Sequence, residues 1–249
     1  MTAALEQTLI DANKSRTLVE YRPELGPDSL DRSYEIQAAV AKALGATVVG
    51  WKCGVQDGGK TVFGAPIFEA NPRKGSGTWQ IPKGQAVKIE VEIALRLAKD
   101  LPPRAKPYAR EEILDAVGEV FAGIEIVASR FSNLPSVPFE ARVADNFNQG
   151  GYVTGGGTSA FRALDLSALR SKLWIDGALV HDKVGGHGQH DPLVPVVAWA
   201  SRQCDKLGGL RAGQIITTGT LNKPPSLDHA AHVEIEIEGL GRAAVDFTA

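Results

Sequence analysis

Two glutamates of this chain have the spacing of a metal site. Glu90 and Glu92 stand two residues apart in the alternating apolar stretch 87–97. Because successive side chains of a strand point to opposite faces, both carboxylates project from the same face, roughly 6 to 7 Å apart at the backbone. With a third carboxylate from another strand they suit a hard divalent cation, magnesium or manganese better than zinc. The alternative is that both glutamates face solvent beside Lys88 and Arg96.

A second cluster shows that spacing alone does not decide. Glu234, Glu236 and Glu238 repeat the same spacing near the end of the chain. There the interleaved apolar residues indicate an amphipathic strand, and Arg242 offers a cross-strand partner. The pattern by itself leaves both clusters open.

Glu125 is the strongest single indication of a functional carboxylate. It lies in the apolar stretch 122–129, where a carboxylate is rarely buried unless it is paired or bound to a metal. The alternative is a salt bridge to Arg130 or to another basic residue.

Basic side chains could act on a substrate. Lys52 lies between apolar Trp51 and a glycine turn, where partial desolvation would lower its pKa and suit it to proton transfer or anion binding. A surface lysine with a buried stem is the alternative. His187 and His190 flank a glycine-rich segment, which favours a loop or a substrate contact over a metal site on a helix.

Apolar periodicity indicates the elements that must position these residues, and their mixture indicates a β-rich α+β fold. Helices are expected over 2–14, from an N-cap at Asp28 to Gly45, over 110–118 and over 192–207. Strands are expected over 48–54, 87–97, 120–129, 172–180 and 213–219, followed by a hairpin over 232–247. A long loop region is expected over 55–80.

Composition excludes several classes of partner. The 249 residues carry a formal net charge of −2 and no Lys/Arg cluster, so we expect no nucleic-acid or membrane partner. Cys53 and Cys204 lie far apart and indicate neither a disulfide framework nor a structural zinc site. The N-terminus lacks signal-peptide features, and no apolar run reaches the roughly 20 residues of a membrane span. We therefore expect a cytoplasmic protein.

Segments along nearly the whole chain together resemble the fumarylacetoacetate hydrolase superfamily. The closer resemblance is to its branch of 2-keto-4-pentenoate hydratases and 4-oxalocrotonate decarboxylases. The segments that carry it are residues 49–54, 63–68, 89–95, 124–130, 143–146 and 216–220. The chain departs from the branch pattern at residues 190–194 and 221–225, where the substrate would be selected.

The resemblance implies a β-rich mixed-sheet roll or barrel with a small helical N-terminal part. A seam near residues 70 to 80 would divide an N-terminal helical and loop region, 1–75, from a catalytic domain, 76–249. The resemblance favours the first glutamate cluster, so that Glu90, Glu92 and Glu125 bind Mg²⁺ or Mn²⁺. The residues implied for catalysis are Lys52 and Asp145, and those implied for substrate binding are Phe68, Asn146, His190, Thr218 and Gly219.

The resemblance also implies a reaction. Water would add to a 2-hydroxy-2,4-dienoate of the 2-keto-4-pentenoate type and give a 4-hydroxy-2-keto acid, as in aromatic meta-cleavage catabolism. A 2-oxo-3-hexenedioate (4-oxalocrotonate) decarboxylase, an acylpyruvate-type hydrolase and a non-catalytic partner subunit stay open. The expected partners are a small 2-keto acid and further copies of the chain. Pro192 and Val194 favour a short uncharged substrate tail, whereas protonated His187 and His190 would favour a second carboxylate.

Overall fold

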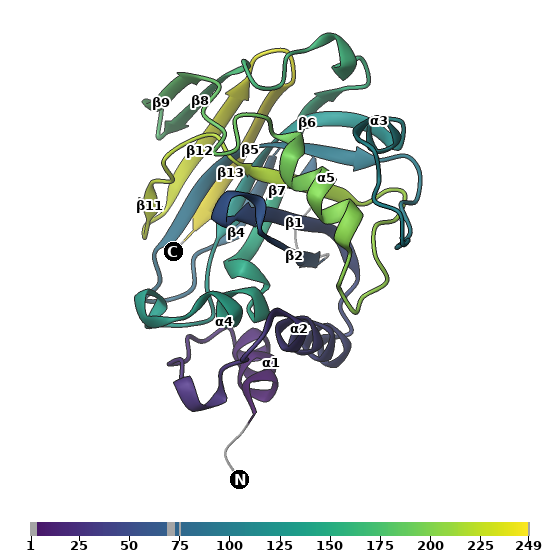
Figure 1. Ribbon diagram of the computed structural model, residues 1–249. Coiled ribbons are helices and arrows are strands. Elements are labelled where there is room, and N and C mark those ends of the chain that lie inside the picture. Colours follow the sequence, from purple (N-terminus) through teal and green to yellow (C-terminus); the bar gives the residue numbers. More distant parts are fainter. Residues whose placement is uncertain (1–3, 69–72, 75, 249) are drawn as a thin grey trace.

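The computed structural model describes residues 4–68, 73–74 and 76–248 (Figure 1). Its helices are α1 (Leu5–Ser15), α2 (Leu30–Leu44), α3 (Arg110–Leu114), α4 (Phe139–Ala144) and α5 (Leu193–Arg202). Its strands are β1 (Val48–Gln56), β2 (Thr61–Phe68), β3 (Arg73–Lys74), β4 (Ser76–Gln80), β5 (Val87–Leu97), β6 (Val117–Val127), β7 (Gln149–Thr158), β8 (Arg170–Ile175), β9 (Ala178–Val184), β10 (Ile215–Thr220), β11 (Ser226–Leu227), β12 (Ala231–Ile237) and β13 (Gly241–Thr248). The fold is α+β and rich in strands, as predicted.

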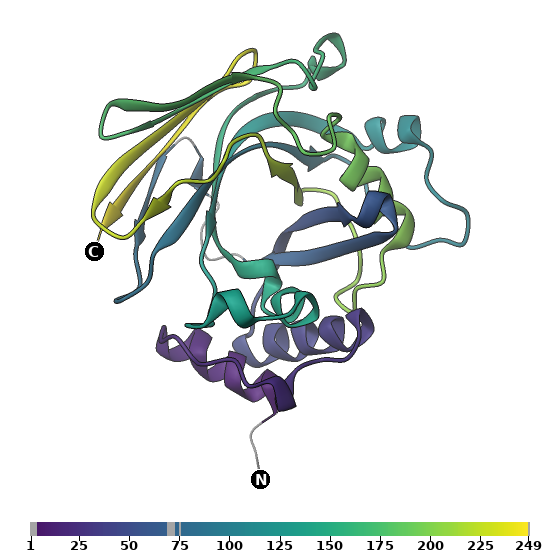
Figure 2. The ribbon, with the colours of Figure 1, turned by 60° about the vertical axis from the view of Figure 1, so that its left-hand side comes forward.

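The strands form two mixed sheets. Within the described residues, the larger sheet has the order β2-β1-β10-β5-β6-β7-β3, with β11 beside β5, and the smaller sheet has the order β4-β13-β12-β8-β9. The larger sheet curls, so that β2 comes round to contact β7, and the smaller sheet packs on its outer side through β13 (Figure 2). This is the rolled, barrel-like architecture that the resemblance implies.

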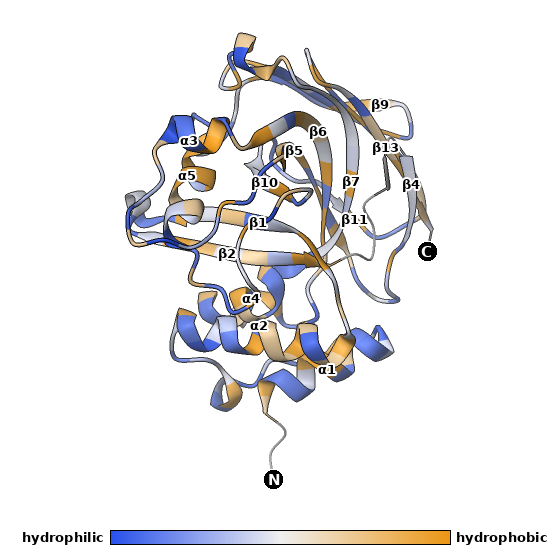
Figure 3. Cartoon of the chain, turned by 90° about the vertical axis from the view of Figure 1, so that its right-hand side faces the viewer, coloured by the Kyte–Doolittle hydropathy of each residue, from blue (hydrophilic) through white to orange (hydrophobic). Residues whose placement is uncertain are grey.

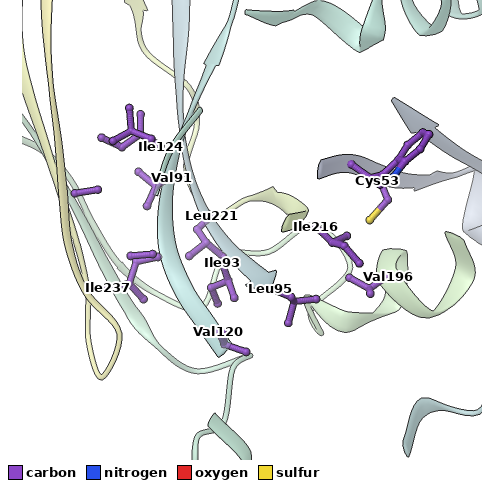
Figure 4. Close-up of a cluster of buried hydrophobic side chains, with 14 of the residues drawn as sticks. Cys53, Val91, Ile93, Leu95, Val120, Ile124, Val196, Ile216, Leu221 and Ile237 are labelled. Carbon is purple, nitrogen blue, oxygen red and sulfur yellow. The ribbon is translucent and has the colours of Figure 1, made fainter. Parts of the chain in front are cut away.

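Strand β5 runs through the middle of the core. Its odd-numbered residues from Val87 to Leu97 are all at most 2% exposed, as the strict alternation predicts. Val91 and Ile93 lie with Ile124 and Ile237 between the two sheets, and the same apolar cluster continues to Val196 of α5 (Figure 4). Burial of these side chains fixes the position of β5 and therefore of the carboxylates it carries.

The other face of β5 is covered in the middle of the strand. Glu92 and Ala94 are fully buried, because the even-numbered face lines the inside of the rolled sheet. The prediction of a half-buried strand is therefore correct at Lys88, which is exposed, and wrong at Glu92 and Ala94 in the middle of the strand. Carboxylates on this face meet other side chains in place of bulk water.

The N-terminal helices form a layer below the rolled sheet (Figure 3). α1 and α2 share an apolar cluster with α4, distinct from the main core. The N-cap of α2 is Ser29, whose hydroxyl accepts the N–H of Arg32, so the predicted cap Asp28 is wrong by one residue. Gly45 ends this helix in the left-handed conformation that favours glycine (φ 60°), as predicted.

The stretch predicted as a long loop, 55–80, contains strands. β2 pairs with β1, and β4 pairs with β13, while residues 69–72 and 75 of this prediction lie outside the described part of the chain. Gly64 and Pro66 favour a loop in the sequence, but β2 is the edge of its sheet, where proline is tolerated. A Cβ on Gly64 would lie 2.4 Å from the ring of Trp199. Glycine therefore lets α5 pack closely on β2.

Two predicted helices are shorter than expected. The helix over 110–118 ends at Leu114, and β6 begins at Val117, because that residue pairs with Leu97 of β5. α5 likewise ends before the predicted limit at residue 207. The other predicted strands and the C-terminal hairpin are observed.

The larger sheet crosses the predicted boundary between residues 75 and 76. It takes β1 and β2 from one side of this boundary and β5, β6, β7, β10 and β11 from the other, and the division into two domains stays a prediction. The helix predicted over 2–14 is observed as α1, although residues 2 and 3 lie outside the described part. None of the described helices is long and apolar enough to cross a membrane.

Candidate active site

The three candidate metal ligands converge inside the rolled sheet. Glu90 and Glu92 lie on β5, and Glu125 lies directly opposite Glu90 on the neighbouring strand β6. One carboxylate oxygen of each residue lies within 4.8 Å of the other two. Glu92 and Glu125 are fully buried, and the side chain of Glu90 is 18% exposed. The three residues form a buried anionic cluster that reaches solvent at Glu90.

Burial makes neighbouring carboxylates costly to ionise. Burial raises the pKa of Glu92 well above its usual value, and Glu125 and Glu90 raise it further. Burial also raises the pKa of Glu125, to about 7, although the nearby Lys52 opposes this. The cluster therefore holds protons more tightly than exposed carboxylates unless further positive charge is supplied.

The unpaired oxygens of the cluster fit a divalent cation. Both oxygens of Glu92 and Oε2 of Glu125 are buried without a hydrogen-bond partner among the residues that the structure describes. Buried polar atoms are nearly always paired, and carboxylate oxygens are the ligands that hard divalent cations prefer. A divalent cation held by the three glutamates would occupy these oxygens and balance their charge.

Lys52 provides positive charge at the cluster. It lies on β1, which β10 separates from β5 in the sheet. Its Nζ donates to Oε1 of Glu125 at 2.7 Å and lies 3.9 Å from Oε2 of Glu90. Burial lowers the pKa of Lys52, but Glu125, Glu90 and Glu92 outweigh it, so the pKa is raised. The lowered pKa that the sequence suggests is therefore wrong, because three carboxylates stabilise the ammonium. Glu125 does form a salt bridge to a basic residue, as the alternative reading of the sequence allows, but its partner is Lys52, and Arg130 pairs with Asp145.

Polar side chains that the sequence does not single out complete the cluster. Tyr152 on β7 lies opposite Glu125, and its hydroxyl is buried without a partner in the described residues, as is Oγ1 of Thr217. Burial and the nearby carboxylates raise the pKa of the Tyr152 phenol. A Cβ on Gly123 would lie 2.0 Å from this hydroxyl, so glycine makes room for it. The one signal in the sequence is a tyrosine within the glycine-dense stretch 150–157.

The second glutamate cluster lies on an exposed strand face. Arg242 on β13 donates to Glu234 and Glu236 on β12, at 2.7 and 2.8 Å. The amphipathic strand with a cross-strand arginine is therefore the correct explanation of this spacing. Within the described residues, Glu90, Glu92 and Glu125 are the group whose ligand atoms converge.

Thr218 and Gly219 form an irregular end of β10 beside β5. Pairing between the strands shifts over these residues and resumes at Thr220, which lies opposite Glu92. His187 is buried, and its Nε2 lies 2.8 Å from the backbone oxygen of Thr218. The predicted Thr218–Gly219 segment is thus next to the carboxylate cluster, and His187 contacts it from the β9–α5 loop.

His190 lies in a different environment. It is exposed, it has a left-handed backbone (φ 62°), and it lines a surface groove of about 460 Å³ together with Arg110 and Asp191. Arg110 and Asp191 pair with each other at 2.6 Å. The structure therefore brings His187, and not His190, to the end of β10. A substrate contact by His190 stays a prediction.

The remaining predicted residues lie near the ends of β2 and α4. The buried carboxylate of Asp145 accepts hydrogen bonds from the Ser129 hydroxyl, the Arg130 backbone and the Arg130 side chain. The next residue, Asn146, is buried, and its Oδ1 has no partner within the described part of the chain. Phe68, at the end of β2, lines a cavity of about 920 Å³ between the N-terminal helices and the strand ends. Asp145 is thus engaged by Arg130, Asn146 keeps a side-chain oxygen unpaired within the described residues, and Phe68 faces the cavity.

The chain matches a known family over most of its length. The family described as fumarylacetoacetate (FAA) hydrolase C-terminal matches residues 67–248. A 2-keto-4-pentenoate hydratase of Paraburkholderia xenovorans (strain LB400) is 31% identical over 254 aligned residues, which cover 97% of this chain and 93% of the relative. A 2-hydroxyhexa-2,4-dienoate hydratase of Comamonas testosteroni is 31% identical over 65% of this chain and 60% of its own length.

Solved structures share the fold. A 4-oxalocrotonate decarboxylase from Pseudomonas putida G7, complexed with magnesium and adipate, has a TM-score of 0.83 at 21% identity and covers 98% of this chain and 95% of its own. A fumarylpyruvate hydrolase from Pseudomonas aeruginosa, in complex with Mn²⁺ and pyruvate, has a TM-score of 0.53 at 14% identity and covers 81% of this chain and 97% of its own. At these identities the likeness supports the rolled α+β architecture.

Proposed function

The chain belongs to the fumarylacetoacetate hydrolase family, and on this premise we propose that it is a metal-dependent hydratase, a carbon–oxygen lyase. It would add water to a 2-hydroxy-2,4-dienoate and release a 4-hydroxy-2-keto acid. The observation that carries the proposal is the buried cluster of Glu90, Glu92 and Glu125, with unpaired oxygens beside the ammonium of Lys52. Hydratases that are about 30% identical over nearly the whole chain support this reaction class.

The three glutamates would hold Mg²⁺ or Mn²⁺. Oxygen ligands on two adjacent strands leave further positions of such an ion open to water and substrate. Bound there, the ion would act as a Lewis acid on the carboxylate and 2-oxygen of the keto acid. Solved neighbours complexed with magnesium, calcium or Mn²⁺ support a divalent cation at this site.

Lys52 would stay protonated and act as a hydrogen-bond donor to the substrate. Because the carboxylates raise its pKa, its Nζ stays charged near neutral pH and can donate hydrogen bonds to the oxygen end of the substrate. Once these carboxylates hold a cation they raise the pKa of Lys52 less, and from the same position the ammonium would then supply a proton to the dienoate. The Tyr152 hydroxyl, whose pKa burial also raises, would stay protonated and serve as a neutral donor. Both groups are suited to orienting a substrate and stabilising charge on oxygen.

The tail of the substrate would be short and uncharged. The expected substrate is a monocarboxylate. Pro192 lies just before α5 and Val194 lies in its first turn, and neither offers a charge to a distal carboxylate. A cytoplasmic location, a 2-keto acid ligand and a homo-oligomer are part of the same proposal.

The decarboxylase is the second candidate. A curated 4-oxalocrotonate decarboxylase of Pseudomonas putida is 26% identical over 64% of this chain. The hydratase of Paraburkholderia xenovorans is 31% identical over 97%. The greater identity and coverage favour hydration. The same keto acid group, polarised by the ion, would also accept the electron pair left when carbon dioxide is lost.

A direct assay tests the proposal. Purified protein is given 2-hydroxypenta-2,4-dienoate, 2-oxo-3-hexenedioate or acetylpyruvate, with Mg²⁺, with Mn²⁺, or after chelation. We expect metal-dependent hydration of the pentadienoate to be fastest. Faster release of carbon dioxide from the dicarboxylate would favour the decarboxylase, and cleavage of acetylpyruvate would favour the hydrolase. Absence of turnover with all three would leave a non-catalytic subunit.

A further inference from the structure

Three consecutive residues near the cluster have an unusual backbone. Asn146, Phe147 and Asn148 have φ angles of 50°, 49° and 61°. Asparagine tolerates this left-handed region, but a bulky residue such as phenylalanine rarely adopts it. Such a conformation persists only where the surroundings impose it. The segment 146–148 is therefore held in place by contacts outside itself.

The side chains of Arg130 and Asp145 supply those contacts. The guanidinium of Arg130 donates to the carboxylate of Asp145, to the backbone oxygen of Asp145 and, at 2.6 Å, to the backbone oxygen of Gln149. It thus joins the residue before the left-handed segment to the residue after it. The Asp145 side chain is 2% exposed and that of Arg130 is 14% exposed, so solvent and salt screen this pair weakly.

The held segment contacts Lys52. The backbone oxygen of Phe147 lies 3.4 Å from Nζ of Lys52, and the centre of its ring lies 5.2 Å from the same atom. The ring is packed in turn against Phe63, with centres 4.4 Å apart. The ammonium therefore has Phe147 on one side and Glu125, at 2.7 Å, on another. Return of Phe147 to a negative φ would turn its peptide and its ring, and Lys52 would lose this contact.

We propose that Arg130 and Asp145 are positioning residues that clamp Phe147 against Lys52 and so keep the ammonium directed at Glu125. The proposal deepens the proposed function and rests on it, because it takes Lys52 as the group that meets the substrate. It gives Asp145 a role through Lys52 in place of direct contact with the substrate. Its carboxylate oxygens are already occupied by Ser129 and Arg130.

A double-mutant cycle tests whether Asp145 acts through Lys52. Asp145→Asn should lower kcat for the dienoate about 10- to 100-fold, less than the roughly 10²–10⁴-fold of losing a general acid–base group, with little change in KM. In a Lys52→Met background the same substitution should cause no further loss, because residues that act through one another are not additive. An equal loss of kcat in both backgrounds, as a purely structural role would give, overturns the proposal.

Matched variants separate the clamp from general destabilisation. Asp182→Asn breaks the exposed ion pair between Asp182 on β9 and Arg170 on β8. This variant should leave kcat unchanged. Arg130→Lys keeps the charge beside Asp145 but cannot bridge to Gln149, so it should lower kcat in the same way as Asp145→Asn. If Asp145→Asn does not fold, Arg130→Lys replaces it in the cycle.

Chemical labelling gives a readout without substrate. Acetic anhydride is added to the wild type and to each variant, and acetylation of Lys52 is followed by mass spectrometry relative to the half-buried Lys172. We expect Lys52 to react several-fold faster in Asp145→Asn and at the wild-type rate in Asp182→Asn. Unchanged labelling in Asp145→Asn overturns the clamp. If the wild type does not hydrate the dienoate, the proposed function fails, and the labelling result alone decides the positioning of Lys52.

Discussion

Strands β5 and β12 carry the same Glu-x-Glu spacing in different surroundings. On β5, Glu92 is fully buried, its oxygens are unpaired within the described chain, and the positive charge at the cluster comes from Lys52. On β12, Glu234 and Glu236 lie on an exposed face, and each is paired with Arg242. A desolvated carboxylate needs compensation, whereas an exposed one is stabilised by water. The same local pattern therefore brings carboxylates together in a buried cluster only where the sheet closes over it.

The largest expected effect separates the lysines of the two regions. Lys52→Ala should lower kcat by about 10²–10⁴-fold, the usual contribution of a general acid–base group, while divalent-cation affinity changes less. Lys172, opposite Glu236 in the register of β8 and β12, is the matched control, and Lys172→Ala should leave kcat unchanged. Steady-state kinetics and metal titration by calorimetry measure both. Full activity of Lys52→Ala would show that this lysine has only a structural role.

The next effect concerns metal binding by the two glutamate clusters. A divalent cation at a hundredfold excess over its dissociation constant should stabilise the folded protein by about 2.7 kcal/mol, which corresponds to a rise in Tm of roughly 5 to 10 °C for a chain of this size. Glu92→Gln should abolish the rise, and Glu236→Gln should keep it. Thermal melts with and without Mg²⁺ measure it. Equal effects of the two substitutions would contradict a site at the first cluster.

A smaller effect should appear as pH dependence of the metal-free protein. The pKa of Glu125 is raised by burial from 4.5 to about 7, so the folded state keeps a proton that the unfolded state releases. The resulting stabilisation is complete below pH 4.5 and is lost as the pH rises through 7.

Urea denaturation between pH 4.5 and 8 tests this dependence. The fall in stability should be reduced in Glu125→Gln and kept in Glu236→Gln, because the latter carboxylate lies on the exposed face. Saturating Mg²⁺ should reverse the trend, since deprotonated carboxylates bind the cation. A Glu125→Gln protein with the wild-type slope would refute the assignment of the proton to Glu125.

The smallest effect is expected at the exposed cluster. Arg242→Gln removes both ion pairs of Glu234 and Glu236, yet exposed pairs contribute little. We expect unchanged turnover and a change in Tm within about 2 °C. Loss of activity in this variant would mean that the two regions are coupled, and the comparison between them would no longer hold.

Local patterns predicted much of the fold correctly. The alternation of β5, the C-terminal hairpin and the left-handed end of α2 at Gly45 all follow from side-chain period or backbone freedom within a short stretch. β2 was predicted as loop because Gly64 and Pro66 usually interrupt strands. Only its edge position and the packing of Trp199 over Gly64 make the strand possible, and neither is visible in the local sequence.

The sequence by itself determined that Glu90 and Glu92 share a face, because this follows from the two-residue period of any strand. The tertiary structure decided that this face is closed, that Glu125 stands opposite Glu90, and that Lys52 pairs with Glu125. It also placed Tyr152 beside the cluster, brought His187 rather than His190 to β10, and joined Asp145 to Arg130. Such pairings depend on the register between strands that are distant in sequence, and residue period carries no information about that register.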